Sequence, residues 1–291
     1  MSTAQQFSDS LAAAVERAAQ SIVTVDARDR QTATGLVWSA EGEILTADHV
    51  LQRDDIKVIL PDGSKHAAKI LGRDPNSDLA LLKIEKTGLT APEFAEVKVG
   101  HLVFAIGRPD DLQADLSTVI AMGGPVRGRH RRLEAYLQTG VTMYPGFSGG
   151  PLVDASGRVV GLNSSALVHG ASLAIPVAEA RKVADILRRD GSVKRGYLGL
   201  VTQPVRLAES IAAQLKQSSG LMIVDLEKGG PAEKSGLLQG DVVVAVDSES
   251  VTDIDSLQGA LGPQSVGQAV AVRVVRGGEL KEVEVVVGAR E

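Results

Sequence analysis

The sequence predicts a mainly β protein: an N-terminal helix, two β-barrels of similar size and, after a linker, a smaller α+β unit. Two observations lead to this fold class. Short runs of β-branched and aliphatic residues follow one another between the first helix and Pro176, separated by turn signals such as Glu41-Gly42, which is typical of barrels or sandwiches. The chain also contains 31 glycines among 291 residues, which favours β structure with many turns.

The N-terminal segment, residues 1–20, reads as an amphipathic helix with Phe7, Leu11 and Val15 beside Ala14 and Ala18 on one face. It lacks the basic start and the apolar stretch of about 7–15 residues that a secretory signal needs. The compartment stays open: we expect the cytoplasm if Met1 is the native start, and a periplasmic or other extracytoplasmic location if a signal or anchor was removed.

Two sets of runs divide near residues 87–96 and predict two six-stranded barrels over residues 21–191. The first set is SIVTV, TATGLVWS, EILTADHV, IKVIL, AAKILGRD and LALLKIE; the second is HLVFAIG, LSTVIAMG, EAYLQT, GPLVDASGRVVGLNSS, which holds two strands, and SLAIPV. A helix that begins near Pro176 and ends at Gly191 closes this domain.

Residues 192–195 are the expected linker, and residues 196–291 form the last domain. Its expected strands are YLGLVT, GLMIVDLE, DVVVAVD, QAVAVRVVRG and LKEVEVVV, and its two expected short helices are PAEKSGL and DIDSLQGAL.

Composition excludes several classes of function. The net charge of −5 gives no general attraction to nucleic acid, and no apolar run approaches the roughly 18 residues that span a membrane. The chain has no cysteine, which excludes disulfides, a thiolate nucleophile and cysteine zinc sites.

Ser148 lies in the glycine-rich stretch MYPGFSGGPL and is read either as a nucleophile or as a small residue in a tight turn. The stretch fits both the G-x-S-x-G elbow of α/β-hydrolases and the G-x-S-G-G turn of chymotrypsin-like proteases. A hydrolase elbow needs a following helix and the order serine, acid, histidine. Here strand, turn and strand follow Ser148, and His169 is the only downstream histidine, so the chymotrypsin-like order is favoured.

His49 and Asp78 are the candidate partners of Ser148. His49 ends an apolar strand and Asp78 heads the apolar run NSDLALLKI; the alternatives are a core or turn histidine and a strand-end cap. His66 and Asp48 are rivals that we disfavour, because one lies in a polar hairpin and the other is next to His49. In such a triad, histidine takes the proton of serine and aspartate fixes the imidazole tautomer.

In that case the backbone N–H groups of Gly146 and Ser148 face the developing oxyanion, and we expect Gly146, Phe147 and Ser148 to form the oxyanion hole. We expect the specificity pocket to be lined by Thr142, Ala171 and Leu173. Since Thr142 and the loop SSALVHGAS carry no acid, cleavage after small or medium aliphatic residues is expected rather than after Lys or Arg.

The chain resembles the HtrA/Deg family of serine proteases over about residues 20–289. EILTADHV, NSDLALLKI and QTGVTMYPGFSGGPLVDASGRVVGLN resemble the histidine, aspartate and serine blocks of the family, and PAEKSGLLQGDVVVAVDS resembles the most recognisable stretch of a PDZ domain. The resemblance implies chymotrypsin-like barrels with one PDZ domain, a serine endopeptidase of unfolded or misfolded proteins, no cofactor or metal, and a homotrimer. It also implies that C-terminal peptides bind by strand addition at Tyr197, Leu198, Gly199 and Leu200.

Three residues depart from the family: Gly140 stands where Asp is usual, and Tyr144 and Phe147 stand where Asn is usual. They favour the alternative function, a catalytically silent PDZ scaffold or chaperone. The run RGRHRR is read as a solvated loop, or as a regulatory loop that senses a bound peptide through Arg127, Arg129, Arg131 and Arg132.

Overall fold

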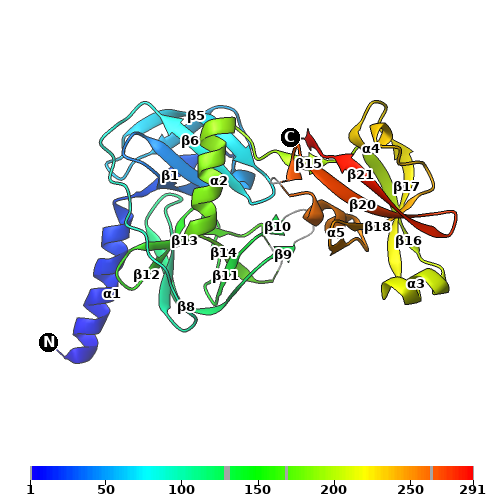
Figure 1. The fold of residues 1–291 in the computed structure, drawn as a ribbon. Helices are drawn as coiled ribbons and strands as arrows, with labels where there is room; N and C mark the ends of the chain where they lie inside the picture. The colour runs from blue at the N-terminus through cyan, green and yellow to red at the C-terminus, as the bar shows by residue number, and fades with distance from the viewer. Residues whose placement is uncertain (1, 128–131, 168–169, 263–264, 291) are drawn as a thin grey trace. The chain divides into compact units, whose positions relative to one another are not determined.

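The computed structural model describes residues 2–127, 132–167, 170–262 and 265–290 (Figure 1). The chain divides into two compact units, Met1–Ser192 and Val193–Glu291.

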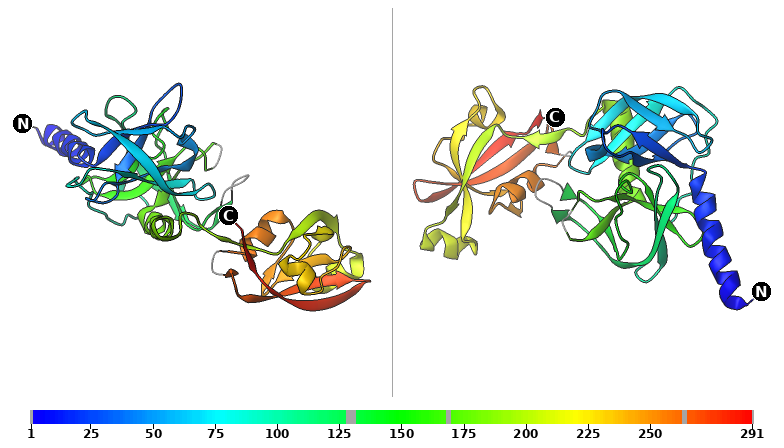
Figure 2. Two further views of the ribbon diagram at one scale, coloured as in Figure 1. Left: turned by 90° about the horizontal axis from the view of Figure 1, so that it is seen from above. Right: turned by 180° about the vertical axis from the view of Figure 1, so that it is seen from behind.

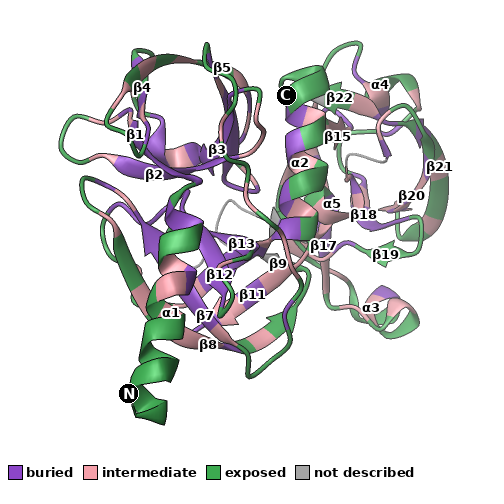
Figure 3. Ribbon diagram, turned by 90° about the vertical axis from the view of Figure 1, so that its left-hand side faces the viewer, coloured by how far each residue is buried: buried purple, intermediate pink, exposed green. Residues whose placement is uncertain are grey.

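The first barrel is a closed sheet in the order β1-β2-β3-β6-β5-β4. Its strands are β1 (Ile22–Asp26), β2 (Ala33–Val37), β3 (Glu43–Ala47), β4 (Ile56–Ile59), β5 (Lys65–Asp74) and β6 (Leu79–Ile84). Strands β2 and β3 are buried along their whole length (Figure 3). Side chains such as Val25, Ile44 and Leu82 belong to the hydrophobic core of this barrel.

The second barrel closes in the order β11-β14-β13-β12-β7-β8. Its strands are β7 (Leu102–Gly107), β8 (Gln113–Gly123), β11 (Tyr136–Thr139), β12 (Pro151–Asp154), β13 (Val159–Ser164) and β14 (Ser172–Pro176). A two-stranded ribbon, β9 (Val126–Arg127) with β10 (Arg132–Leu133), stands apart from the barrel sheet. The predicted pair of six-stranded barrels is confirmed.

Helix α2 (Val177–Asp190) packs on β5 and β6 of the first barrel and on β13 and β14 of the second. It begins one residue after Pro176 and ends at Gly191, whose left-handed φ of 76° terminates the helix as expected from the sequence. Arg188 in its last turn binds Glu43 of β3 through two hydrogen bonds of 2.6 and 2.8 Å. The helix therefore ties the two barrels together.

Helix α1 (Thr3–Ala19) extends away from the barrels, and its N-terminal half is exposed (Figures 2 and 3). Ala14 and Ala18 are buried, and Ala14 approaches Gly157 so closely that a Cβ there would lie 2.4 Å from the Ala14 carbonyl oxygen. Phe7, expected on the same face, is 55% exposed, and the N-terminal part of the helix extends beyond the barrels (Figure 2).

The second unit is built on the sheet β16-β17-β18-β20-β21, with β19 beside β18, and on the separate pair β15 and β22. Its strands are β15 (Arg195–Tyr197), β16 (Leu200–Arg206), β17 (Ser219–Leu226), β18 (Val242–Val246), β19 (Glu249–Ser250), β20 (Ala269–Arg276), β21 (Glu279–Val286) and β22 (Gly288–Arg290). Its helices are α3 (Glu209–Leu215), α4 (Pro231–Lys234) and α5 (Ile254–Ala260).

Two sequence predictions for this unit were wrong. Helix α3 was missed, because its seven residues carry a single buried apolar side chain, Ile211, and give no periodic signal. The expected single strand over YLGLVT is interrupted at Leu198 and Gly199, where Gly199 takes a φ of +77° that ends β15 before β16 begins. Among the described residues, no helix is both long and apolar enough to cross a membrane.

Candidate active site

The pairing of β3 with β6 brings His49 and Asp78 together. In this antiparallel ladder Ala47 lies opposite Leu79, so the chain leaving β3 meets the chain entering β6. His49 lies in a 3-10 turn (Asp48–Val50) directly after β3, and Asp78 is the residue before β6. Two residues 29 positions apart thus share one end of the barrel.

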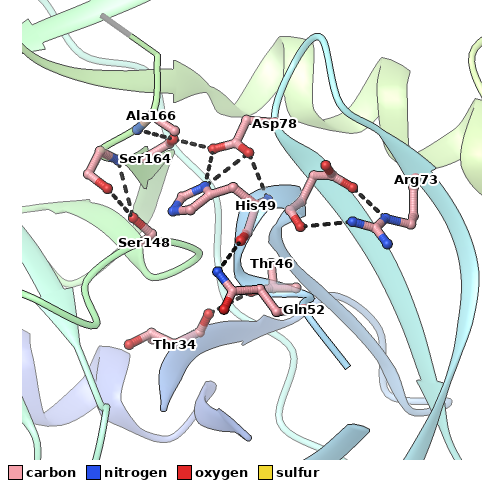
Figure 4. A network of polar contacts seen from close by, with 11 residues as sticks. Thr34, Thr46, His49, Gln52, Arg73, Asp78, Ser148, Ser164 and Ala166 are labelled. Atoms are coloured by element: carbon pink, nitrogen blue, oxygen red, sulfur yellow. Dashed lines mark hydrogen bonds and ion pairs between the residues drawn. The ribbon is translucent and has the colours of Figure 1, made fainter. Parts of the chain in front are cut away.

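The Asp78 carboxylate is held on several sides (Figure 4). Its oxygens lie 2.8 and 3.0 Å from His49 Nδ1, one of them also accepts the His49 backbone N–H at 3.0 Å, and the Ser164 hydroxyl donates to the other. Asp78 is fully buried and has a left-handed φ of 60°, a conformation that Asp tolerates better than most residues. Because a carboxylate only accepts, Nδ1 of His49 carries the proton and Nε2 is left to act as a base.

The rival residues have other partners. Asp48 is buried, and its carboxylate accepts a 2.6 Å hydrogen bond from Arg73 Nε. His66 Nε2 lies 3.0 Å from the Ser64 hydroxyl within its own hairpin. Neither side chain is directed at the His49–Asp78 pair.

Ser148 is presented by a turn that the sequence specifies locally. Pro145 and Gly146 occupy the central positions of a turn closed by a 3.1 Å bond from Phe147 N–H to the Tyr144 carbonyl, with Gly146 at φ +90°. Proline followed by a glycine with positive φ is the signature of a type II turn. Gly149 fits only without a side chain, since a Cβ would lie 2.2 Å from the Thr34 carbonyl oxygen.

Hydrogen bonds from the first barrel also fix this loop. The Thr34 hydroxyl of β2 donates to the Gly146 carbonyl at 2.7 Å, and the Thr34 N–H donates to the Ser148 carbonyl at 3.3 Å. The backbone of Gly149 in turn donates to the Asn163 carbonyl of β13 at 2.9 Å. The candidate nucleophile therefore lies at the junction of the two barrels, as do His49 and Asp78.

The bulky Phe147 is accommodated inside the second barrel. Its ring is fully buried in the core cluster, and it meets the ring of Tyr144 edge-on at 5.5 Å between centroids. The oxyanion hole expected from Gly146, Phe147 and Ser148 stays a prediction; in the structure, the Phe147 N–H donates to the Tyr144 carbonyl inside the turn. The N–H groups of Gly146 and Ser148 donate to no described residue, so they are available to a ligand.

Residues expected to line the specificity pocket lie on two neighbouring segments. Strands β11 and β14 pair with Thr139 opposite Ser172, and the Ser172 hydroxyl donates to the Val141 carbonyl at 2.7 Å. This brings exposed Thr142 near the segment that carries Ala171 and buried Leu173. Val168 and His169 of the same loop lie outside the described residues.

Sequence reasoning missed three residues around the site. Asp115 of β8 accepts the Thr142 N–H at 2.6 Å, Ser164 donates to Asp78, and Ser165 contacts Ser148 at 3.0 Å between hydroxyl oxygens. The dipeptide Ser164-Ser165 at the end of a strand was the only available signal, and it has no specificity by itself.

In the second unit, backbone carbonyl groups of the segment from Tyr197 to Leu200 accept hydrogen bonds from other parts of the unit. The carbonyl of Leu198 accepts from Ala232 N–H at 2.8 Å, and that of Gly199 accepts from Glu227 N–H at 2.9 Å. The following strand, β16, is at the edge of its sheet, with β17 as its only partner among the described strands. An edge strand can accept a further strand.

The arginine run is only partly described. The backbones of Arg127 and Arg132 lie opposite each other in the β9–β10 ribbon, and Arg129 and Arg131 lie outside the described residues. A role for these arginines in sensing a peptide stays a prediction.

Comparisons with known proteins agree with this architecture. Residues 33–162 match the trypsin-like peptidase domain, and residues 196–287 match the PDZ domain. The chain is 37% identical over 271 residues to a probable periplasmic serine endoprotease DegP-like of Chlamydia muridarum, covering 89% of this chain and 54% of that protein. The corresponding protein of Pseudomonas fulva is 39% identical over 272 residues, with 88% and 55% covered, so the chain spans about half the length of these curated relatives.

A solved structure of the HtrA-type protease AlgW with a tripeptide is 31% identical, has a TM-score of 0.75 and matches over 97% of both chains. The match spans both units of this chain, the one with the trypsin-like domain and the one with the PDZ domain. The chain belongs to the HtrA/DegP-like family of serine proteases, with a trypsin-like domain and one PDZ domain.

Proposed function

We propose that this protein is a serine endopeptidase that cleaves unfolded or misfolded polypeptides, with His49, Asp78 and Ser148 as its catalytic triad. The observation that carries the proposal is the 2.8 Å contact of His49 Nδ1 with the buried Asp78 carboxylate, beside a loop that presents Ser148. This contact fixes the imidazole tautomer and stabilises the imidazolium that forms during reaction.

The reaction follows from these atoms. The Ser148 Oγ attacks the scissile carbonyl carbon while its proton passes to His49 Nε2. The oxyanion accepts hydrogen bonds from the backbone N–H groups of Gly146 and Ser148. In a comparable site, each such donor lowers the activation free energy by about 3–4 kcal/mol. His49 then protonates the leaving amine as the C–N bond breaks. Water, with His49 as base, releases the acyl group from Ser148.

Labelling with a fluorophosphonate probe, together with digestion of unfolded casein, tests the proposal. Wild type should be labelled at Ser148 and should digest casein, whereas Ser148→Ala should do neither. Absence of labelling in wild type across temperatures and in the presence of C-terminal peptides would contradict it. That result would favour the catalytically silent PDZ scaffold.

Peptide binding to the PDZ domain is the proposed regulation. The exposed edge of β16 supports strand addition, and the N–H groups of Leu198, Gly199 and Leu200 are the proposed donors to a peptide carboxylate. Stimulation by C-terminal peptides should be weaker in a variant with Arg127, Arg129, Arg131 and Arg132 changed to Ala. Equal stimulation of both proteins would exclude the arginine loop as the sensor. Subunit assembly into a homotrimer is likewise proposed.

A further inference from the structure

The hydroxyl of Ser148 is bound to Ser165 and not to His49. The two Oγ atoms lie 3.0 Å apart, and the Ser165 backbone N–H donates to Ser148 Oγ at 3.2 Å. Between the described residues His49 and Ser148 there is no side-chain hydrogen bond, and Figure 4 draws no contact between them. The nucleophile therefore lies in an orientation other than the one in which histidine takes its proton.

The two contacts compete directly with catalysis. A serine hydroxyl has one proton to donate and two lone pairs to accept with. The N–H of Ser165 occupies one lone pair of Ser148 Oγ, and the Ser165 hydroxyl takes either its proton or the other lone pair. To react, Ser148 must turn about its Cα–Cβ bond to another staggered position and donate to His49 Nε2 instead.

The hydroxyl of Ser165 has no other partner among the described residues, and Ser165 is exposed. Its neighbour Ser164 differs in both respects: Ser164 is buried, and its hydroxyl binds Asp78 and accepts the Ala166 N–H. Adjacent serines at the end of β13 thus bind two different members of the proposed triad. Ser164 supports the acid, whereas Ser165 holds the nucleophile.

We propose that Ser165 is a positioning residue that keeps Ser148 in a resting orientation, which substrate must displace before acylation. This inference rests on the proposed peptidase function. Because Ser165 is exposed, an arriving acyl group can take its place beside Ser148 without any change in the buried core.

The test compares four full-length proteins: wild type, Ser165→Ala, Ser165→Thr and Ser164→Ala. Ser165→Ala removes the competing hydroxyl but retains the backbone N–H. One net hydrogen bond corresponds to about a two- to tenfold change in rate, so the rate of fluorophosphonate labelling and kcat/KM on a short peptide should rise by that factor. Because the contact is lost when substrate binds, the gain should appear mainly as a lower KM, with kcat changed by less than about twofold. Ser165→Thr keeps the hydroxyl and should retain the wild-type rates.

Ser164→Ala is the matched control, because it removes a hydroxyl from the adjacent position. It takes a donor away from Asp78, so its kcat should fall. Unchanged or lower labelling of Ser165→Ala, or Ser165→Thr behaving like Ser165→Ala, would overturn the resting role while the peptidase function stands. Failure of both wild type and Ser165→Ala to label would overturn the peptidase function, and the resting role with it.

Discussion

The ring of Phe147 lies directly against Gly107: a Cβ added at Gly107 would come within 2.4 Å of Phe147 Cδ1. Gly107 is the last residue of β7, and Phe147 is the residue before the proposed nucleophile. The loop that carries Ser148 is therefore anchored by a buried aromatic side chain, for which the absence of a side chain at position 107 leaves room.

Changing Gly107 to Ala should displace the Phe147 ring and, with it, the oxyanion turn. Overpacking of this kind costs about 1–3 kcal/mol of stability. The rate of Ser148 labelling should fall at least about tenfold, because a misplaced oxyanion N–H donor stabilises the transition state much less. Adding Phe147→Leu to Gly107→Ala should restore part of the labelling rate and part of the stability, the latter measured by thermal unfolding. Wild-type labelling of Gly107→Ala would show that the ring does not position the loop.

Changing Asp78 to Asn should lower turnover by about 10⁴, because the amide stabilises the wrong imidazole tautomer. Asp48→Asn is the matched control, since its carboxylate binds Arg73 and lies next to His49 in sequence. Its kcat should stay within about threefold of wild type. A loss of less than tenfold in Asp78→Asn would mean that Asp78 does not orient the histidine.

Cleavage of an unfolded substrate should occur mainly after Val, Ala, Leu or Met. Thr142, Ala171 and Leu173 offer no charge to a basic side chain, and the Asp115 carboxylate is already bound to the Thr142 N–H. Mass spectrometry of the fragments gives the cut sites for wild type and for Asp115→Asn. Cuts mainly after Lys or Arg that disappear in Asp115→Asn would instead make Asp115 the specificity residue.

Stability should fall in acid partly through Glu43. Hydrogen bonds from Arg188 lower the pKa of the Glu43 carboxyl below its ordinary value. A carboxyl with a lowered folded pKa stabilises above its unfolded pKa of about 4.3, and this contribution is lost as the pH falls through the folded pKa. The free energy of unfolding of Glu43→Gln should be lower than that of wild type by about 1–2 kcal/mol at pH 7, a modest figure because Arg188 is partly exposed. Below pH 5, the free energy of unfolding of this variant should change less with pH than that of wild type. Urea unfolding from pH 3 to 7 measures both the loss of stability and its pH dependence. If the pH dependence below pH 5 were the same in Glu43→Gln and wild type, Glu43 would not contribute to the loss of stability in acid.

The intact chain should be a homotrimer in solution at micromolar concentration. Phe7 is 55% exposed on α1, and an isolated helix cannot bury such a side chain. Light scattering should give a smaller mass for protein lacking residues 1–20 and weaker assembly for Phe7→Ala, whereas the exposed Gln6→Ala should behave as wild type. A monomeric mass for the intact chain would exclude the trimer.

The sequence alone determined the order of the elements in both barrels and the residue types at the site, but it missed helix α3. Alternating apolar runs and turn signals predicted both barrels, and Pro145-Gly146 specified the turn before Ser148, because these signals act between near neighbours in the chain. The family blocks also indicated His49, Asp78 and Ser148 as candidates.

Only the tertiary structure decided which side chains meet. The register of Ala47 with Leu79 sets His49 against Asp78, the end of β7 supplies Gly107, and the residue after β13 is Ser165. Such contacts join residues 17 to 40 positions apart, through strand pairing and packing that no local pattern encodes. The orientation of the Ser148 hydroxyl and the burial of Phe147 follow from those contacts, because each depends on the space that distant segments leave.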